Sequence, residues 1–365
     1  MESSRRPQTL KRTSLKIGAH IHRLLRGADA PSPLNEFAHW VDGENIRFEA
    51  ASKCQLKCPM CPTAKGLNKT GVVGWGTLKA LDFKSFIDGN PQIKNIELSN
   101  WGEIFLNPEL TQILQYAFEG HIILTVGNGA NLNTASDEVL EALVKFQIRD
   151  LTVSIDGASA QTYKIYRVGG DFDKVISNIK KLNQFKEKHN CEFPRLTWQF
   201  IVFGHNEHEI ALARELAGSL NMRFYAKLSL DHWDVPPFSP VQDLEHVRKE
   251  LDGVATREEF RVKHKQEYSV PCFQFWTQPQ INWDGKLLGC CDNVFGDFGN
   301  ALESDLSDLL QGERFVYAKK MLLGKVAPRA DIPCTSCPIF KRRALPKALQ
   351  AMSWRRRWLH KFLMS

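Results

Sequence analysis

The sequence of 365 residues lacks the segments that would carry a protein into or across a membrane. It has no uncharged apolar run of the ~18 residues that a spanning helix needs. Its basic start contains no apolar block of the kind found in secretory signals. We therefore expect a cytoplasmic protein, in a compartment where thiols stay reduced. The nine cysteines are then better candidates for metal ligands than for disulfides.

Acidic residues are nearly missing from both ends of the chain. Residues 1–26 contain seven Lys or Arg and one acid, and residues 341–365 contain eight and none. The overall charge of +7 therefore hides a central part, 27–340, with a net charge of −7. An acidic body lacks the basic working face of a nucleic-acid enzyme, so we expect no nucleic-acid partner.

Each basic end also contains apolar residues at helical spacing, and the second contains two tryptophans beside three arginines. A basic amphipathic helix with tryptophans is typical of an interfacial anchor. Peripheral association with the anionic inner face of a membrane is therefore one hypothesis for the ends. Packing on the acidic body and disorder are the alternatives.

Between residues 46 and 230, short β-type runs alternate with amphipathic helical stretches. The strand candidates are 46–52, 95–99, 121–126, 151–155, 195–203 and 223–230. Strand–helix alternation predicts right-handed βαβ units and a parallel sheet. Six units are too few for a closed eightfold barrel, so we predict an α/β fold with a partial (β/α)6 barrel. Its chemistry should lie at the carboxyl ends of the strands.

The rest of the chain divides by composition into four segments. We expect a basic N-terminal extension at 1–45, a linker with a helix at 231–270, a small cysteine-rich auxiliary domain at 271–343, and a basic amphipathic tail at 344–365.

Three cysteines, Cys54, Cys58 and Cys61, stand directly after the first predicted strand in "KCQLKCPMCP". Structural zinc and ordinary iron–sulfur sites take four protein ligands. A partial zinc site or a set of buried thiols is one interpretation. The other is a four-iron cluster held by three thiolates, with one iron open to an exchangeable ligand.

This arrangement resembles the cluster motif of the radical S-adenosylmethionine superfamily. In that family the open iron chelates the amino acid end of S-adenosylmethionine, and an electron releases a 5′-deoxyadenosyl radical. The resemblance implies an enzyme with S-adenosylmethionine and a three-cysteine 4Fe-4S cluster as cofactors. It also implies an external electron donor such as flavodoxin or ferredoxin.

Further motifs follow the predicted strands in order. "SNWGEIFLNPEL" is similar to the family's GGEP motif, in which the acid holds the methionine ammonium. Gly102 and Glu103 match that motif, whereas Trp101 and Ile104 depart from it. After the third strand, "VGNGANL" resembles the family's TNG turn, which implies that Asn128 lies near the ligand.

The fourth strand ends in "VSIDG", where Ser154 and Asp156 match family positions near the ribose and the carboxylate. "YKIYRVGGDFDKV" then resembles the family stretch whose arginine pairs with the methionine carboxylate. The resemblance assigns this bidentate task to Arg167.

A second set of cysteines lies in the last third of the chain. The set "C-x12-G-x4-C" followed by "CTSC" is a four-thiolate pattern, for which a zinc ribbon is the structural alternative. Behind a radical core it resembles the SPASM/twitch auxiliary-cluster domains. The resemblance implies one auxiliary 4Fe-4S cluster that serves as an electron relay, with Cys291 able to replace Cys290. The implied ligands are Cys272, Cys290, Cys334 and Cys337.

Two polar residues on the last strands are candidates for substrate chemistry. Gln199 and Lys227 alternate with apolar neighbours, so each faces one side of its strand. Solvent exposure is the plain alternative. If the side chains face the barrel interior, Gln199 would contact the substrate and a desolvated Lys227 could accept a proton.

The resemblance implies removal of hydrogen from a substrate C–H bond. We expect dehydrogenation or epimerisation of a small molecule of the sugar or cyclitol type, because the residues before the first strand do not match the leader-binding module of many peptide-modifying relatives. A peptide- or protein-modifying SPASM maturase is the alternative. A non-enzymatic zinc-binding module is the alternative of another class.

Overall fold

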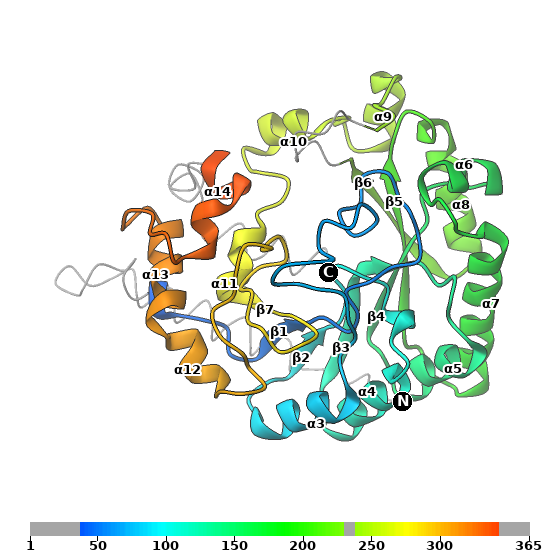
Figure 1. The fold of residues 1–365 in the computed structure, drawn as a ribbon. Helices are drawn as coiled ribbons and strands as arrows, with labels where there is room; N and C mark the ends of the chain where they lie inside the picture. The colour runs from blue at the N-terminus through cyan, green and yellow to red at the C-terminus, as the bar shows by residue number, and fades with distance from the viewer. Residues whose placement is uncertain (1–36, 230–237, 343–365) are drawn as a thin grey trace, which may run out of the picture.

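A computed structural model of the chain describes residues 37–229 and 238–342 (Figure 1). The two basic ends lie outside the described residues, and so does the hypothesis of membrane association. Within the part that the structure describes, no helix combines the length and the apolarity needed to cross a bilayer.

The core is a seven-stranded parallel sheet in the order β6-β5-β4-β3-β2-β1-β7. Six strands follow one another along the chain, as the sequence predicted: β1 Asn45–Phe48, β2 Asn95–Glu97, β3 Ile123–Ala130, β4 Asp150–Ser154, β5 Arg195–Val202 and β6 Met222–Leu228. Every neighbouring pair is parallel, so all six carboxyl ends meet at one edge. The predicted partial (β/α)6 barrel is therefore confirmed.

Helices cover the outer face of this sheet (Figure 1). They are α3 Ala80–Gly89, α4 Leu110–Glu119, α5 Asp137–Lys145, α6 Ala160–Tyr166, α7 Phe172–Lys188 and α8 Ile210–Ser219. In α7, the fully buried Val175, Ile179 and Leu182 recur at helical spacing, which gives the helix one apolar face for the core. Side-chain caps fix several starts; the Asp171 carboxylate, for example, accepts from the Lys174 amide of α7.

The two faces of β5 show how the sheet divides core from site. Trp198 and Phe200 are fully buried in the hydrophobic core that the helices cover. Gln199 lies between them in sequence and therefore points to the opposite, inner face of the barrel. The inner face is where the polar side chains gather.

The C-terminal part is joined to the barrel rather than set beside it. Its strand β7, Gln280–Ile281, pairs in parallel with β1, with Arg47 opposite Gln280 and Phe48 opposite Ile281. One hydrophobic core includes barrel residues such as Phe48 and auxiliary residues such as Phe315. Sequence analysis did not anticipate this strand, because two residues carry no periodic signal.

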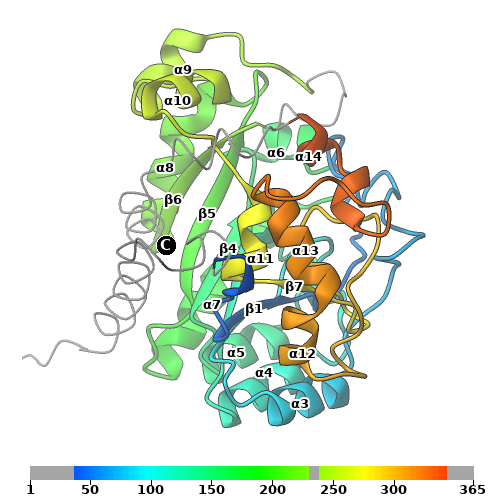
Figure 2. The same ribbon diagram turned by 90° about the vertical axis from the view of Figure 1, so that its left-hand side faces the viewer.

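The elements around β7 are short. After β6 come α9 Leu244–Glu250, α10 Arg257–His264, η3 Pro271–Phe273, α11 Gln274–Thr277, α12 Leu306–Gln311, α13 Glu313–Leu322, η4 Pro333–Ser336 and α14 Pro338–Arg342. In both views α12 and α13 lie on the β1 and β7 side of the molecule, away from α8 (Figures 1 and 2). The auxiliary domain thus extends the sheet at the edge that starts with β1.

Candidate functional site

The three cysteines after β1 lie on one loop at the carboxyl edge of the sheet. Cys58 is buried in a small apolar cluster with Leu56, Met60, Tyr166 and Phe203, and the partly buried Cys54 and Cys61 pack against the same cluster. Burial raises the pKa of the Cys54 thiol to about 12. A metal cluster would supply the positive charge that keeps such thiols ionised. The structure therefore brings the three thiols together, and their role as ligands stays a prediction.

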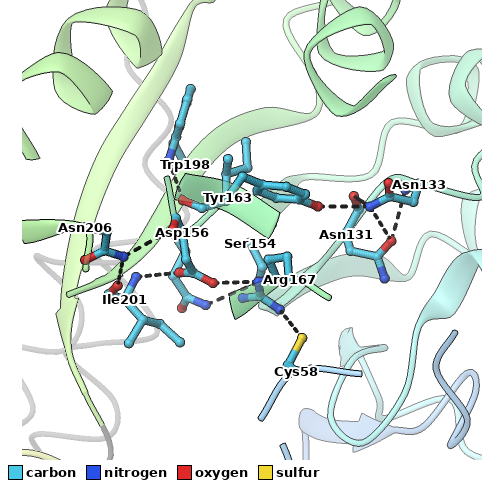
Figure 3. A network of polar contacts seen from close by, with 12 residues as sticks. Cys58, Asn131, Asn133, Ser154, Asp156, Tyr163, Arg167, Trp198, Ile201 and Asn206 are labelled. Atoms are coloured by element: carbon cyan, nitrogen blue, oxygen red, sulfur yellow. Dashed lines mark hydrogen bonds and ion pairs between the residues drawn. The ribbon is translucent and has the colours of Figure 1, made fainter. Parts of the chain in front are cut away.

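Arg167 lies between this loop and β4 (Figure 3). Its Nη1 is 3.7 Å from the Cys58 sulfur, and its Nε donates to the Asp156 carboxylate at 2.5 Å. Asp156 is fully buried, and its second oxygen accepts from the Ile201 amide at 2.6 Å. Asp156 therefore holds the guanidinium in place, which leaves the remaining donors of Arg167 for a carboxylate. The sequence placed Asp156 at the ligand; in the structure both of its oxygens already bind protein groups.

Glu103 begins the short helix η1, Ile104–Leu106, on the other side of the loop. Its carboxylate is buried and accepts from the amides of Asn131 at 2.6 Å and Phe105 at 3.3 Å. Burial raises the pKa of Glu103 to about 7, because the two amides only partly replace water. A cation placed beside it would restore the charged form. An ammonium group fits this requirement.

The turn that carries Glu103 is fixed to the cluster loop. The Glu103 amide donates to the Lys53 carbonyl at 2.9 Å, and a β-carbon on Gly102 would lie 2.2 Å from the Ala51 carbonyl oxygen. Only glycine allows this approach, which explains the Gly-Glu pair of the motif. Beneath the turn, the buried Glu49 carboxylate accepts from the amides of Trp101 and Gly102. Sequence analysis missed Glu49, because a single acid near a strand end is not a signal.

The last residues of β3 and the residue after it contribute two asparagines. Asn128, which the sequence singled out, is exposed and donates to the Asn100 carbonyl at 3.1 Å. Asn131, which it missed, lies closer to the cysteines: its Nδ2 is 3.8 Å from the Cys54 sulfur, and its Oδ1 accepts from Gln55 at 2.8 Å. Asn131 is the second asparagine of "NGAN". The sequence alone did not indicate that its side chain points towards the cysteine loop.

Polar side chains form a row across the inner face of β4, β5 and β6. Ser154 is the register partner of Gln199, and Gln199 is that of Tyr225. Gln199 is buried and its Nε2 lies 3.4 Å from the Ser154 hydroxyl. Gly129 faces this row with φ +115°, and a β-carbon there would meet the Ser154 hydroxyl at 2.3 Å. Gln199 is therefore not a solvent-exposed residue.

Lys227 follows Tyr225 by two residues on β6, so the two side chains lie on the same face of the strand. It is partly buried, and burial lowers the pKa of its ammonium group. The charge of Arg257 lowers this pKa further, whereas that of Asp156 raises it. Lys227 thus lies on the inner face of the last barrel strand.

The auxiliary domain gathers four thiols around one small apolar pocket. They are the four implied ligands, Cys272, Cys290, Cys334 and Cys337. Cys291 does not line the cavity; its amide donates to Gln274 at 2.6 Å and its carbonyl accepts from Asn100 at 3.0 Å. The geometry therefore favours Cys290 over Cys291.

A pocket lined by four thiols offers the ligands that a metal centre needs. Zinc draws four thiolates to about 2.3 Å from one point. Four thiols spread around an apolar cavity are the donor set that a four-iron cluster needs.

The comparisons with known proteins agree with this geometry. The family model SPASM, an iron–sulfur cluster-binding domain, matches residues 272–338. The AdoMet-dependent heme synthase of Methanosarcina barkeri is 29% identical over 182 residues, which cover 49% of this chain and 48% of that protein. The probable GTP 3′,8-cyclase of Archaeoglobus fulgidus is 23% identical over 237 residues, 62% of this chain and 74% of that protein.

A third relative is the mycofactocin maturase MftC of Mycobacterium ulcerans, which is 24% identical over 155 residues, 42% of this chain and 40% of that protein. The chain thus aligns with about half or less of the length of the heme synthase and of the maturase. Among solved structures, Streptococcus suis SuiB bound to its precursor peptide SuiA superposes with a TM-score of 0.56 at 14% identity. That match covers 91% of this chain and 83% of SuiB, and it shows the fold alone.

Proposed function

Because the chain is a radical S-adenosylmethionine enzyme with a C-terminal SPASM domain, we propose that it oxidises a C–H bond of a small polar substrate of the sugar or cyclitol type. Such a dehydrogenation removes one hydrogen atom, one proton and one electron from an alcohol carbon and its hydroxyl. When bound, the barrel cluster with S-adenosylmethionine supplies the radical that takes the hydrogen atom, and the auxiliary cluster supplies an acceptor for the electron.

The residues of the barrel edge would hold the cofactor. Cys54, Cys58 and Cys61 are the proposed ligands of the catalytic cluster. Glu103 would bind the methionine ammonium and Arg167 its carboxylate, with the buried Asp156 orienting the guanidinium. Ser154 and Asn128, at the ends of neighbouring strands, would face the rest of the ligand.

The four-thiol cavity of the auxiliary domain is the observation that leads us to propose oxidation of the substrate rather than another fate of its radical. A cluster with four protein ligands has no open iron, so it has no position at which a substrate can bind. Its remaining use is to exchange electrons, and β7 holds this domain against β1 of the barrel. An electron acceptor fixed near the site favours loss of an electron from the substrate over return of a hydrogen atom.

Lys227 would take the proton of the substrate hydroxyl. A base must be neutral before it can accept a proton, and partial burial lowers the pKa of this amine towards that state. Lys227→Met should slow product formation by about 10²–10⁴-fold, the usual size of a general-base contribution. Formation of 5′-deoxyadenosine from S-adenosylmethionine should persist.

The test is anaerobic incubation of the protein, with both clusters in place, with dithionite, S-adenosylmethionine and a panel of sugars and cyclitols. We expect one compound to raise the yield of 5′-deoxyadenosine and to lose two hydrogens by mass spectrometry. A product of unchanged mass and inverted configuration would assign an epimerase instead.

Peptide modification is the second candidate function, supported by the sequence alignment with the mycofactocin maturase. Precursor peptides therefore belong in the same panel, and a stimulated 5′-deoxyadenosine yield with a peptide but with no sugar would select this candidate. The matching family model is an iron–sulfur domain, so the zinc-binding module is set aside.

A further inference from the structure

We propose that a small acidic one-electron carrier protein docks on the lysine-bearing surface of residues 53–79, beside the catalytic cluster loop. The proposal rests on the proposed function, since an enzyme of this kind must receive an electron before each cleavage. It goes further by naming where on this chain the donor binds and which side chains attract it.

The segment between β1 and α3 is strongly one-sided in charge. Residues 50–81 contain no acidic residue. They contain five lysines, all exposed: Lys53, Lys57, Lys65, Lys69 and Lys79. Within the described residues, only Lys79 among the five forms an ion pair, at 3.1 Å from Glu109. The other four add positive charge to a body that is acidic as a whole, so their charge is available to a partner.

Apolar side chains lie among these lysines. Leu67 is 64% exposed and Trp75 is 40% exposed, with the Lys69 ammonium 5.2 Å from the centre of the Trp75 ring. Electron-transfer partners form small interfaces at the low end of the size range, with apolar contacts inside a charged rim. Exposed lysines around exposed apolar side chains match this composition.

The end of α6 continues the same surface. The Lys57 amide donates to the Val168 carbonyl at 2.9 Å, which places the two segments side by side. Ile165 and Val168 are 44% and 39% exposed, and Lys164, in the last turn of α6, is exposed as well. The surface therefore surrounds the cluster loop on two sides.

The position of this surface suits delivery of an electron. The cluster cysteines stand within the lysine-bearing segment itself, and two of them, Cys54 and Cys61, are only partly buried. No other element therefore has to lie between a docked carrier and the cluster loop. The far end of the segment contacts the auxiliary domain, where Asn282 and Trp283 donate to the Val73 carbonyl at 2.8 and 2.9 Å.

Opposite charge would act mainly on the rate of encounter. Complementary patches raise association rates by 10-fold or more at low ionic strength, and salt screens them over about 8–10 Å. Rim charges change the association rate and its salt dependence more than they change the final contact. The proposal is therefore tested by kinetics, with the catalytic chemistry kept out of the measurement.

The experiment uses the full chain with both clusters in place and flavodoxin hydroquinone, an acidic carrier, as the probe. Stopped-flow absorbance follows oxidation of the flavodoxin at low and high salt. The test variant is Lys57→Glu/Lys65→Glu/Lys69→Glu. The control variant, Lys145→Glu/Lys174→Glu/Lys180→Glu, makes the same charge change at exposed lysines of α5 and α7, on the outer helices. Lys57 is next to the proposed ligand Cys58, so Lys65→Glu/Lys69→Glu is measured beside the triple variant; the other residues lie outside the proposed cofactor site.

We expect the wild-type rate to fall with salt and the test variant to be slowed at least tenfold at low salt, while the control variant keeps most of the wild-type rate. Reduction by dithionite, a small anion that needs no docking surface, should remain in all three proteins and reports that the clusters are intact. Dithionite-driven 5′-deoxyadenosine formation separately tests the proposed function.

Equal flavodoxin rates for the test and control variants would overturn the proposal, and so would a wild-type rate that salt does not change. If the test variant binds a polyanion column less tightly than the wild type but oxidises flavodoxin at the wild-type rate, the lysines form a general polyanion-binding surface and the proposal is wrong.

Discussion

Burial decides what the ionisable residues around the cluster loop can do. Glu103, at the start of η1, and Asp156, after β4, are both buried carboxylates, yet they differ in their partners. Asp156 is paired with Arg167, whereas Glu103 accepts only from neutral amides. One carboxylate is thus paired with a cation and the other is not, which is why we propose Asp156 as a positioning residue and Glu103 as a ligand-binding residue.

The first prediction concerns the two proposed contacts to the methionine part of the cofactor. Glu103→Ala and Arg167→Ala should each lower the affinity for S-adenosylmethionine about ten- to a hundredfold, because a charge-assisted contact is worth roughly 1.5–3 kcal/mol. Asp156→Asn should reproduce part of the Arg167 loss, since it frees the guanidinium. Equilibrium binding to the reconstituted protein measures all three. Wild-type affinity in the Glu103 and Arg167 variants would remove both from the site.

The buried lysine of α13, Lys319, provides a second expectation at the residue scale. It is fully buried in α13, with its ammonium 3.3 Å from the Trp40 carbonyl, and burial lowers its pKa to about 7. The unfolded chain binds this proton more tightly, so stability should rise with pH between about 7 and 10.5. Each unit of the pKa difference corresponds to about 1.4 kcal/mol.

Lys319→Met should therefore raise the melting temperature at pH 7, and the gain should shrink as the pH approaches 10. Thermal unfolding at a series of pH values measures this. Lys320→Met, at the neighbouring partly buried position, is the control. A gain that does not depend on pH would show that packing, not the buried charge, is responsible.

At the scale of elements, the sequence predicted those helices and strands whose hydrophobic residues recur periodically. Strand–helix alternation indicated the six barrel strands, and helical spacing indicated helices such as α7. Their observed bounds differ from the expected ones by a few residues. The motif at Gly102 and Glu103 was found because its residues are contiguous. Glu49 and Asn131 were not, because each acts through a contact between segments that lie far apart in the sequence.

Gly102 tests how tightly two elements are joined. Gly102→Ala should push the Glu103 turn away from the cluster loop, because the added carbon would lie 2.2 Å from the Ala51 carbonyl. We expect loss of the catalytic cluster with retention of the auxiliary one, seen as a drop to about half of the wild-type iron. Gly89→Ala, where nothing lies within 4 Å of the added carbon, is the matched control. A wild-type iron content in Gly102→Ala would show that the backbone around Gly102 and Ala51 can shift to accept the added carbon.

At the scale of the whole molecule, the junction of β7 with β1 is the feature that the sequence did not reveal. It makes the auxiliary domain a continuation of the barrel sheet, with one hydrophobic core through both. The family resemblance supplied the two cluster motifs, but their relative placement depends on a two-residue strand. The proposed proton acceptor, Lys227, lies on β6 at the opposite edge of the same sheet.

The central claim is that this sheet holds two four-iron clusters, and the iron and zinc content of the anaerobically reconstituted protein tests it most directly. We expect about eight irons per chain in the wild type, about four in Cys290→Ala, and about eight in Cys291→Ala, whose thiol does not line the cavity. A wild-type protein with four irons and one zinc, or a Cys290→Ala variant that keeps all its iron, would contradict the account.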